Sequence, residues 1–152
     1  TNIDPQTQIK GQGFDIVFLD VDNTILPRDT HEIPEDINKW LEDLLTSGLK
    51  VCLLSNSFKE GVNKLGDELG FPVLTGSFKP LPIALNRAFR KMGASRKNSV
   101  LIGDQVFTDS LGAHLVGMKY YMVEALSEVD LLHTTIFRKL EKCILRNIDP
   151  QD

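Results

Sequence analysis

The stretch FLDVDNTILPRD, from Phe18 to Asp29, contains the end of a predicted strand and two acidic residues that point to the fold and to a site. An apolar run that ends at Leu19 is followed by two aspartates, Asp20 and Asp22, with one valine between them. Two carboxylates this close repel each other, and a carboxylate at the end of a buried strand needs a stabilising partner. A metal ion, a reaction on phosphate, or an ordinary polar turn would each explain the pair.

The composition is that of a globular protein without a metal-binding cysteine pattern. Its 152 residues are 41% hydrophobic and 25% charged, and this length favours one domain over residues 1–152. The formal net charge of −4 gives no reason to expect nucleic acid as a partner. Cys52 and Cys143 form no CxxC pair, which argues against a zinc site or a disulfide scaffold and favours a reducing compartment.

Five short apolar runs predict the strands of a parallel sheet. Each run is nearly continuous rather than alternating, which is typical of strands that are covered on both faces. The runs are Ile16–Leu19, Val51–Leu54, Val73–Thr75, Val100–Ile102 and Tyr120–Val123. Apolar residues at helical spacing predict helices between them, over Ile33–Ser47, Lys59–Leu69, Pro82–Met92 and Asp109–Val116. This alternation predicts an α/β fold with a single doubly wound, mostly parallel five-stranded sheet.

Polar side chains follow the ends of the first four predicted strands. In an open parallel sheet, ligands bind beyond the carboxyl ends of the strands, so we expect these side chains to meet at one edge. They are, strand by strand, Asp20 and Asp22, then Ser55 and Asn56, then Lys79, and finally Asp104 and Asp109.

This set of side chains suits phosphoryl transfer. Oxygen ligands from Asp20 and Asp104 suit Mg²⁺, which would offset the repulsion between the carboxylates. Asp20 would attack phosphorus to form an aspartyl-phosphate, and Asp22 would protonate the leaving oxygen and later deprotonate water. Ser55 and Lys79 would hold phosphate oxygens.

Two of these residues have a plainer explanation that the sequence leaves open. Thr108 and Asp109 also fit the N-cap of the helix that follows them. Asn56 either contacts the substrate or caps the turn after its strand.

The four clusters resemble the motifs of the haloacid dehalogenase (HAD) superfamily of phosphatases. Their sequences are DVDNT (Asp20–Thr24), SNS (Ser55–Ser57), KP (Lys79–Pro80) and GDQVFTD (Gly103–Asp109). Together with the GAHLVGM that follows, they look like the YqeG-like branch, which includes mitochondrial phosphatidylglycerophosphate phosphatases. The resemblance extends from about Phe14 to Val123.

The resemblance implies a role for each matched residue. Asp20 corresponds to the nucleophile, Asp22 to the general acid and base, and Ser55 and Lys79 to phosphate ligands. The implied ligands of Mg²⁺ are Asp20, the backbone carbonyl of Asp22, and Asp104. Asp109 would be either an additional ligand or a residue that contacts the ligands without binding the metal.

The spacing of the motifs leaves no room for a cap domain. One helix and one strand fit between Asp22 and Ser55, and the same between Ser55 and Lys79. An open site either borrows cover from another subunit or acts on a phosphate that something large presents, such as a lipid headgroup. With the resemblance, this favours phosphatidylglycerophosphate as substrate, hydrolysed to phosphatidylglycerol. A soluble phosphomonoester is the alternative.

The C-terminal stretch LLHTTIFRKLEKCILR, over Leu131–Arg146, predicts an amphipathic helix. Its apolar row and its basic residues would suit a membrane interface beside anionic lipid, or a last helix packed on the sheet. No run approaches a membrane span and no signal peptide is visible, which favours the cytoplasm or the mitochondrial matrix, with peripheral membrane contact. The chain begins at Thr1 rather than methionine, so the sequence leaves open whether an anchor precedes it.

A phospho-receiver switch is the alternative from a different functional class, because it uses similar side chains on a five-stranded sheet. Receiver domains carry adjacent acidic residues and a phosphorylated aspartate after the third strand. Here the acidic residues straddle Val21, and the run Val73–Thr75 leads to no aspartate. The pattern therefore favours the phosphatase.

Overall fold

Five parallel strands form one sheet in the order β3-β2-β1-β4-β5. The computed structural model describes residues 3–28, 30, 32–56, 60–76 and 82–127. The strands are β1 (Ile16–Asp20), β2 (Lys50–Leu54), β3 (Val73–Leu74), β4 (Ser99–Gly103) and β5 (Lys119–Met122). The predicted doubly wound sheet is confirmed, and β1 lies at its centre. Lys79 and the predicted amphipathic helix over residues 131–146 lie outside the described residues.

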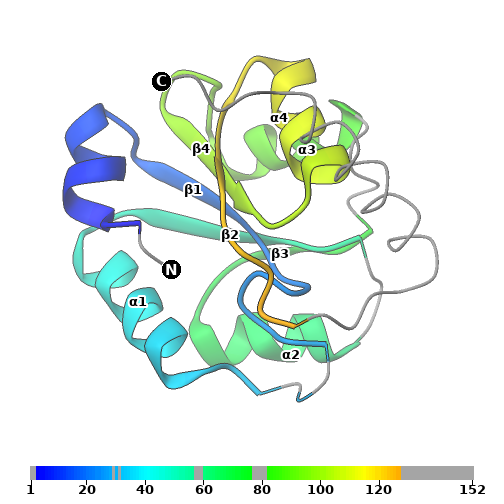
Figure 1. Cartoon of the computed structure of the whole chain (residues 1–152). Helices are drawn as coiled ribbons and strands as arrows, with labels where there is room; N and C mark the ends of the chain where they lie inside the picture. The colour runs from blue at the N-terminus through cyan, green and yellow to red at the C-terminus, as the bar shows by residue number, and fades with distance from the viewer. Residues whose placement is uncertain (1–2, 29, 31, 57–59, 77–81, 128–152) are drawn as a thin grey trace, which may run out of the picture.

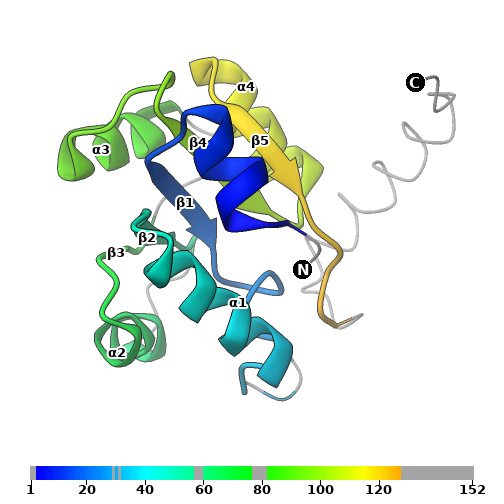
Figure 2. The same cartoon turned by 90° about the vertical axis from the view of Figure 1, so that its left-hand side faces the viewer.

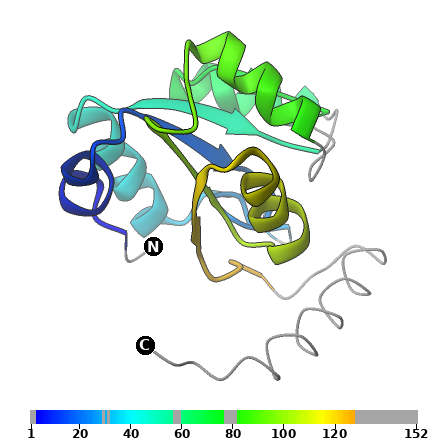
Figure 3. The same cartoon turned by 90° about the horizontal axis from the view of Figure 1, so that it is seen from above.

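Within the described residues, four α-helices cover the two faces of this sheet. They are α1 (Glu35–Thr46), α2 (Glu60–Leu69), α3 (Pro82–Met92) and α4 (Leu111–Val116). Helices α1 and α2 lie on one face, and α3 and α4 lie on the other (Figures 1 and 2). Figure 3 shows the same layers from above, with α3 and α4 toward the viewer. No cap domain interrupts these layers among the described residues.

Two helix boundaries differ from the predictions for local reasons. Helix α1 starts at Glu35 because Pro34 is its N-cap and has the extended backbone of a residue outside the helix. Asp109 was predicted to open the last helix, but it belongs to a π-helical turn, η3 (Val106–Ser110), and Ser110 is the N-cap of α4.

The segment before β1 was missed by the sequence analysis. It forms two short turns, η1 (Pro5–Ile9) and η2 (Lys10–Gln12). The carboxylate of Asp4 caps the first turn, and the backbone N–H of Thr7 is the main cause that lowers the pKa of this carboxyl. Ile9 is fully buried, so this segment belongs to the packed domain. The turns are too short to show a helical period in the sequence.

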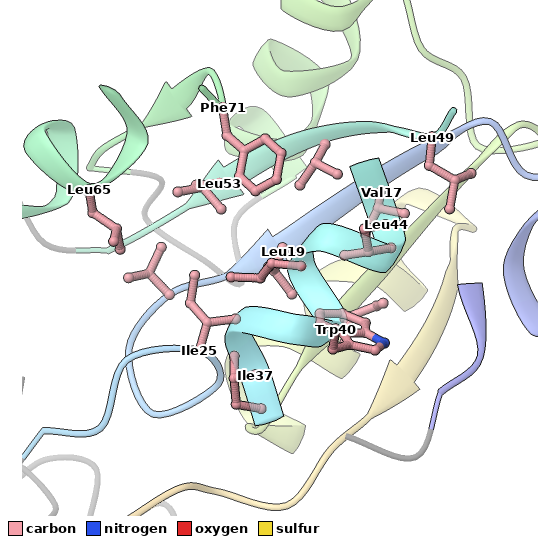
Figure 4. Packing of buried hydrophobic residues seen from close by; sticks show 14 of the residues in the cluster. Val17, Leu19, Ile25, Ile37, Trp40, Leu44, Leu49, Leu53, Leu65 and Phe71 are labelled. Atoms are coloured by element: carbon pink, nitrogen blue, oxygen red, sulfur yellow. The ribbon is translucent and has the colours of Figure 1, made fainter. Parts of the chain in front are cut away.

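The core has two halves, one on each face of the sheet. Val17 and Leu19 of β1 pack with α1 and α2, as Figure 4 shows, whereas Phe18 packs with α3 and α4. Successive side chains of a strand point to opposite faces, so a strand covered on both sides needs apolar residues at every position. This burial explains the continuous apolar runs of the sequence. Among the described residues, no helix has the length and apolarity that crossing a bilayer requires.

Candidate active site

The carboxyl ends of three neighbouring strands bring the predicted site residues together. Asp20 is the last residue of β1, Ser55 directly follows β2, and Asp104 directly follows β4. Because β1 lies between β2 and β4 and all three run parallel, their ends meet at one edge of the sheet. The sequence predicted this convergence.

Three buried carboxylates form the centre of this edge. Asp20, Asp104 and Asp109 each place one carboxylate oxygen within 4.8 Å of the others. Their exposed fractions are 4%, 5% and 0%. Charges this close and this buried repel strongly, and a divalent cation with oxygen ligands offsets that repulsion. The donor set, three carboxylate oxygens without nitrogen or sulfur, fits hard cations such as Mg²⁺.

Thr24 links two of these carboxylates. Its hydroxyl lies 3.3 Å from Asp20 Oδ2 and 3.3 Å from Asp104 Oδ1, and the residue is 1% exposed. A hydroxyl has one hydrogen to donate, so the two carboxylates share it. Thr24 belongs to the DVDNT motif, but no role was predicted for it; its position four residues after Asp20 is the sequence feature that could have indicated the contact.

Asp109 reaches the centre because Gly103 lacks a side chain. A Cβ added to Gly103 would lie 2.4 Å from Asp109 Oδ2, so the strand or the carboxylate would have to move. The same carboxylate oxygen accepts a hydrogen bond of 3.3 Å from the backbone N–H of Gln105. Asp109 therefore points back toward the sheet and is not the N-cap of α4. Tyr120 supports this corner from β5, since its hydroxyl donates to the Gly103 carbonyl at 2.8 Å.

Asp22 lies apart from the carboxylate cluster. Its side chain is half-buried, and its Oδ2 accepts a hydrogen bond of 3.1 Å from the Ser55 hydroxyl. The side chains of the two aspartates of DVD thus have different neighbours. Asp20 lies beside Asp104, and Asp22 bonds Ser55, which directly follows β2. Asn56 is exposed next to Ser55, and its function stays a prediction, as does that of Lys79 outside the described residues.

Asn23, between the acidic pair and Thr24, is a residue that the sequence analysis missed. It is fully buried and has a φ of 66°, in the left-handed region that asparagine and glycine tolerate best. Its side chain bonds Ser127 three times at 2.8 Å: Oδ1 accepts from the backbone N–H and from the hydroxyl, and Nδ2 donates to the carbonyl. The loop after β1 and the segment that ends at Ser127 accordingly run side by side (Figures 1 and 2).

Comparison with known proteins identifies the family. The model of a family described as "Hydrolase: haloacid dehalogenase-like hydrolase" matches residues 4–117. The chain belongs to this family of hydrolases. It is 32% identical over 129 residues to a protein of Bacillus subtilis (strain 168) named "Probable phosphatase YqeG", covering 85% of this chain and 75% of that protein. The expected superfamily is thereby confirmed.

Solved structures show the same fold at low sequence identity. An uncharacterized protein from Listeria monocytogenes serotype 4b aligns with a TM-score of 0.62 and 16% identity, over 78% of this chain and 85% of that one. The cobalt-bound deoxy-D-mannose-octulosonate 8-phosphate phosphatase of Haemophilus influenzae aligns with a TM-score of 0.55 and 13% identity, over 89% of each chain. Phosphatases of this family generally use a divalent metal, and the buried aspartate cluster fits one.

Proposed function

We propose that the chain is a phosphatase that hydrolyses a phosphomonoester through an aspartyl-phosphate on Asp20. The observation that carries the proposal is that two carboxylates at the carboxyl end of β1, two residues apart, have different surroundings. Asp20 lies in the buried cluster with Asp104, whereas Asp22 lies outside it and bonds Ser55. Membership of the hydrolase family and the similarity to the Bacillus subtilis protein support the reaction class.

The reaction divides into two steps that Asp20 and Asp22 share. A carboxylate oxygen of Asp20 attacks phosphorus, the bond from phosphorus to the leaving oxygen breaks, and protonated Asp22 gives that oxygen its proton. Asp22 then takes a proton from water, which attacks phosphorus and breaks the bond to Asp20. Inorganic phosphate leaves, and both carboxyl groups return to their initial states.

The carboxylates of Asp20, Asp104 and Asp109 would hold a divalent cation, for which we propose Mg²⁺. When bound there, the cation would supply electrostatic stabilisation of the charge on the phosphoryl oxygens. Thr24 keeps the carboxylates of Asp20 and Asp104 at a fixed spacing through its shared hydroxyl. The name of the Haemophilus influenzae protein, a cobalt-bound phosphatase, supports a divalent metal at this type of site.

Ser55 holds Asp22 before the substrate binds. Its hydroxyl donates to the carboxylate of Asp22 and would turn to a phosphate oxygen when the phosphate enters. Lys79 is proposed as the cationic phosphate ligand on the strength of the KP motif, and Asn56 as a contact for the rest of the substrate.

Phosphatidylglycerophosphate is the substrate that we propose, with phosphatidylglycerol as the product. Support comes from the resemblance of the motifs to the YqeG-like branch and from the absence of a cap among the described layers. A site without a cap leaves the phosphate accessible to a surface that presents a headgroup. The enzyme would meet this substrate at the membrane surface that faces the cytoplasm or the mitochondrial matrix.

Phosphate release tests the substrate class. The full chain, stripped of metal and supplied with Mg²⁺, is assayed on phosphatidylglycerophosphate in vesicles and on a panel of soluble phosphomonoesters. The proposal expects the highest kcat/KM on the lipid and no turnover without the metal. A soluble compound hydrolysed with higher kcat/KM than the lipid would refute the substrate, and failure on every phosphomonoester would refute the phosphatase.

A further inference from the structure

The two helical layers of the molecule differ in charge. From residue 69 to residue 123, a range that includes α3, β4, α4 and β5, the only acidic residues are Asp104 and Asp109 of the site. Both are buried, so the described residues of this range expose no carboxylate; the exposed Asp15 lies beside it, since its backbone N–H donates to the Asn98 carbonyl at 2.9 Å. It exposes Arg87, Arg90, Lys91, Arg96, Lys97 and Lys119.

The opposite layer carries the negative charge. Helices α1 and α2 alone contain Glu35, Asp36, Glu42, Asp43, Glu60, Asp67 and Glu68. The chain as a whole has a net charge of −4, so the basic layer is not a consequence of overall composition. A separation of charge onto opposite faces gives the molecule one face that attracts anions.

The basic layer also exposes large aliphatic side chains. Ile83 of α3 is 68% exposed, and Leu111 and Leu115 of α4 are 40% and 52% exposed. Beside them, a cleft of about 420 Å³ is lined by Phe89, Leu115 and other residues of the α3–α4 contact, among them Arg96. Cations and aliphatic side chains are therefore both exposed on the layer formed by α3 and α4, which we call the α3–α4 face. Figure 3 shows the two helices of this layer toward the viewer.

This face adjoins the carboxylate cluster. Helix α4 begins at Leu111, two residues after Asp109, so its first turn starts at the site edge of the sheet. Helix α3 runs beside α4 on the same side of the sheet. The site end of the α3–α4 face, where α3 and α4 begin, therefore adjoins the site, whereas Arg90 and Arg96 lie toward the amino ends of the strands.

We propose that the α3–α4 face docks on a lipid surface that contains anionic headgroups. Arg87, Arg90 and Arg96 would lie among the headgroups, and aliphatic side chains such as Ile83 and Leu115 would enter the boundary of the acyl chains. The consequence of this docking for the substrate rests on the proposed phosphatase function. A phosphatase docked in this way would meet a phosphomonoester that the same lipid surface presents.

A lipid surface fits these side chains better than other anionic partners. Single-stranded nucleic acid stacks its bases on aromatic side chains, whereas the exposed apolar residues here are aliphatic. The cores of protein interfaces are depleted in charged residues, but interfaces are enriched in arginine, so the experiment below includes an acidic protein as an outcome. A headgroup layer accepts cations and aliphatic side chains at neighbouring depths.

Co-sedimentation of the full chain with vesicles tests the docking. The vesicles contain either phosphatidylcholine alone or equal parts of phosphatidylcholine and phosphatidylglycerol. A triple variant, Arg87→Gln, Arg90→Gln and Arg96→Gln, should lose more than about tenfold in affinity for the anionic vesicles at low salt. A double variant, Ile83→Ser and Leu115→Ser, should lose affinity at low and at high salt, because salt does not screen apolar contacts.

Matched variants outside the α3–α4 face, in α1, in α2 and at the start of β2, control for charge and apolarity. Lys39→Gln, Lys50→Gln and Lys64→Gln together remove the same charge from exposed positions, and Leu45→Ser removes an aliphatic side chain that is 50% exposed. Both should keep wild-type affinity within about twofold. The C-terminal cations beyond residue 127 are unchanged in every variant, so they cannot produce a difference between the two layers.

Each outcome decides the proposal. Equal losses from the two charge triples, or no preference of the wild type for anionic vesicles, overturn it. A loss from the arginine triple with none from the Ile83 and Leu115 variant also overturns it, in favour of a polyanion without an apolar layer, such as an acidic protein. If vesicle binding behaves as expected while no phosphomonoester is hydrolysed, the docking face stands and the proposed function fails.

Discussion

Asn23 and Ser127 join two parts of the chain that are 104 residues apart through three side-chain hydrogen bonds of 2.8 Å. The backbone adds a fourth, from the Leu126 N–H to the Asn23 carbonyl at 2.9 Å. Asn23 directly follows Asp22, so the segment after β5 determines where the loop with the proposed general acid lies. We therefore expect Asn23 to position Asp22 without taking part in the chemistry.

The first prediction concerns Asn23→Gly, which keeps the left-handed backbone but removes the bonds to Ser127. A positioned general acid contributes about 10²–10⁴-fold, and its contribution matters most when the leaving oxygen is a poor leaving group. The kcat/KM for an alkyl phosphate should fall about tenfold more than that for p-nitrophenyl phosphate, whose leaving group departs without a proton. The measurement is the ratio of the two kcat/KM values at saturating metal.

Two further variants separate positioning from folding. Ser127→Ala removes the bond from the hydroxyl to Asn23 and the longer bond that the hydroxyl accepts from the Arg28 N–H, but it keeps the two bonds of the Ser127 backbone to Asn23. It should change the ratio less than Asn23→Gly does. Asn63→Gly, at an exposed position of α2, should lower stability without changing the ratio. Equal losses on both substrates in Asn23→Gly would show that the contact with Ser127 is structural only.

The same contact shows what the sequence could and could not predict. The strands were predictable because burial on both faces requires continuous apolar runs, and the site because parallel strands end at one edge. The bonds between Asn23 and Ser127 left no local pattern, since neither the spacing nor the residue types identify a partner so far along the chain. Thr24 was visible within DVDNT, but its bridge between Asp20 and Asp104 depends on the approach of β1 to β4.

The second prediction tests Asp20 as the nucleophile. Asp20→Asn fills the same space, but its amide cannot attack phosphorus, so turnover should fall by about 10³-fold or more at saturating metal. Beryllium fluoride, which mimics an acyl-phosphate, should inhibit the wild-type enzyme. Thermal unfolding of the variant verifies that it is folded. Residual activity above a few per cent in a folded Asp20→Asn protein would refute the covalent mechanism.

The third prediction separates the metal site from the general acid. Asp104 belongs to the carboxylate cluster and Asp22 does not, so Asp104→Ala should raise the metal concentration that gives half the maximal rate about tenfold or more. Asp22→Asn should lower the maximal rate and leave that concentration within about twofold. The melting temperature supplies a readout without catalysis, because a ligand that binds only the folded state stabilises it.

In that experiment Mg²⁺ should raise the melting temperature of the wild type and of Asp22→Asn, but not that of Asp104→Ala. Identical metal titrations of the two variants would mean that the cluster does not hold the catalytic ion.

The fourth prediction concerns Gly103, whose missing side chain makes room for the carboxylate of Asp109. In Gly103→Ala the new methyl group would lie 2.4 Å from Asp109 Oδ2, so either the strand or the carboxylate must move. Overpacking of this kind costs about 1–3 kcal/mol in the free energy of unfolding, which chemical denaturation measures. Gly61→Ala is the matched control, since no atom lies within 4 Å of its added Cβ in helix α2, and it should stabilise the protein by up to about 1 kcal/mol.

Displacement of Asp109 should also raise the metal concentration needed for half the maximal rate in Gly103→Ala but not in Gly61→Ala. Unchanged stability together with an unchanged metal requirement in Gly103→Ala would mean that Asp109 neither packs on the end of β4 nor belongs to the metal site.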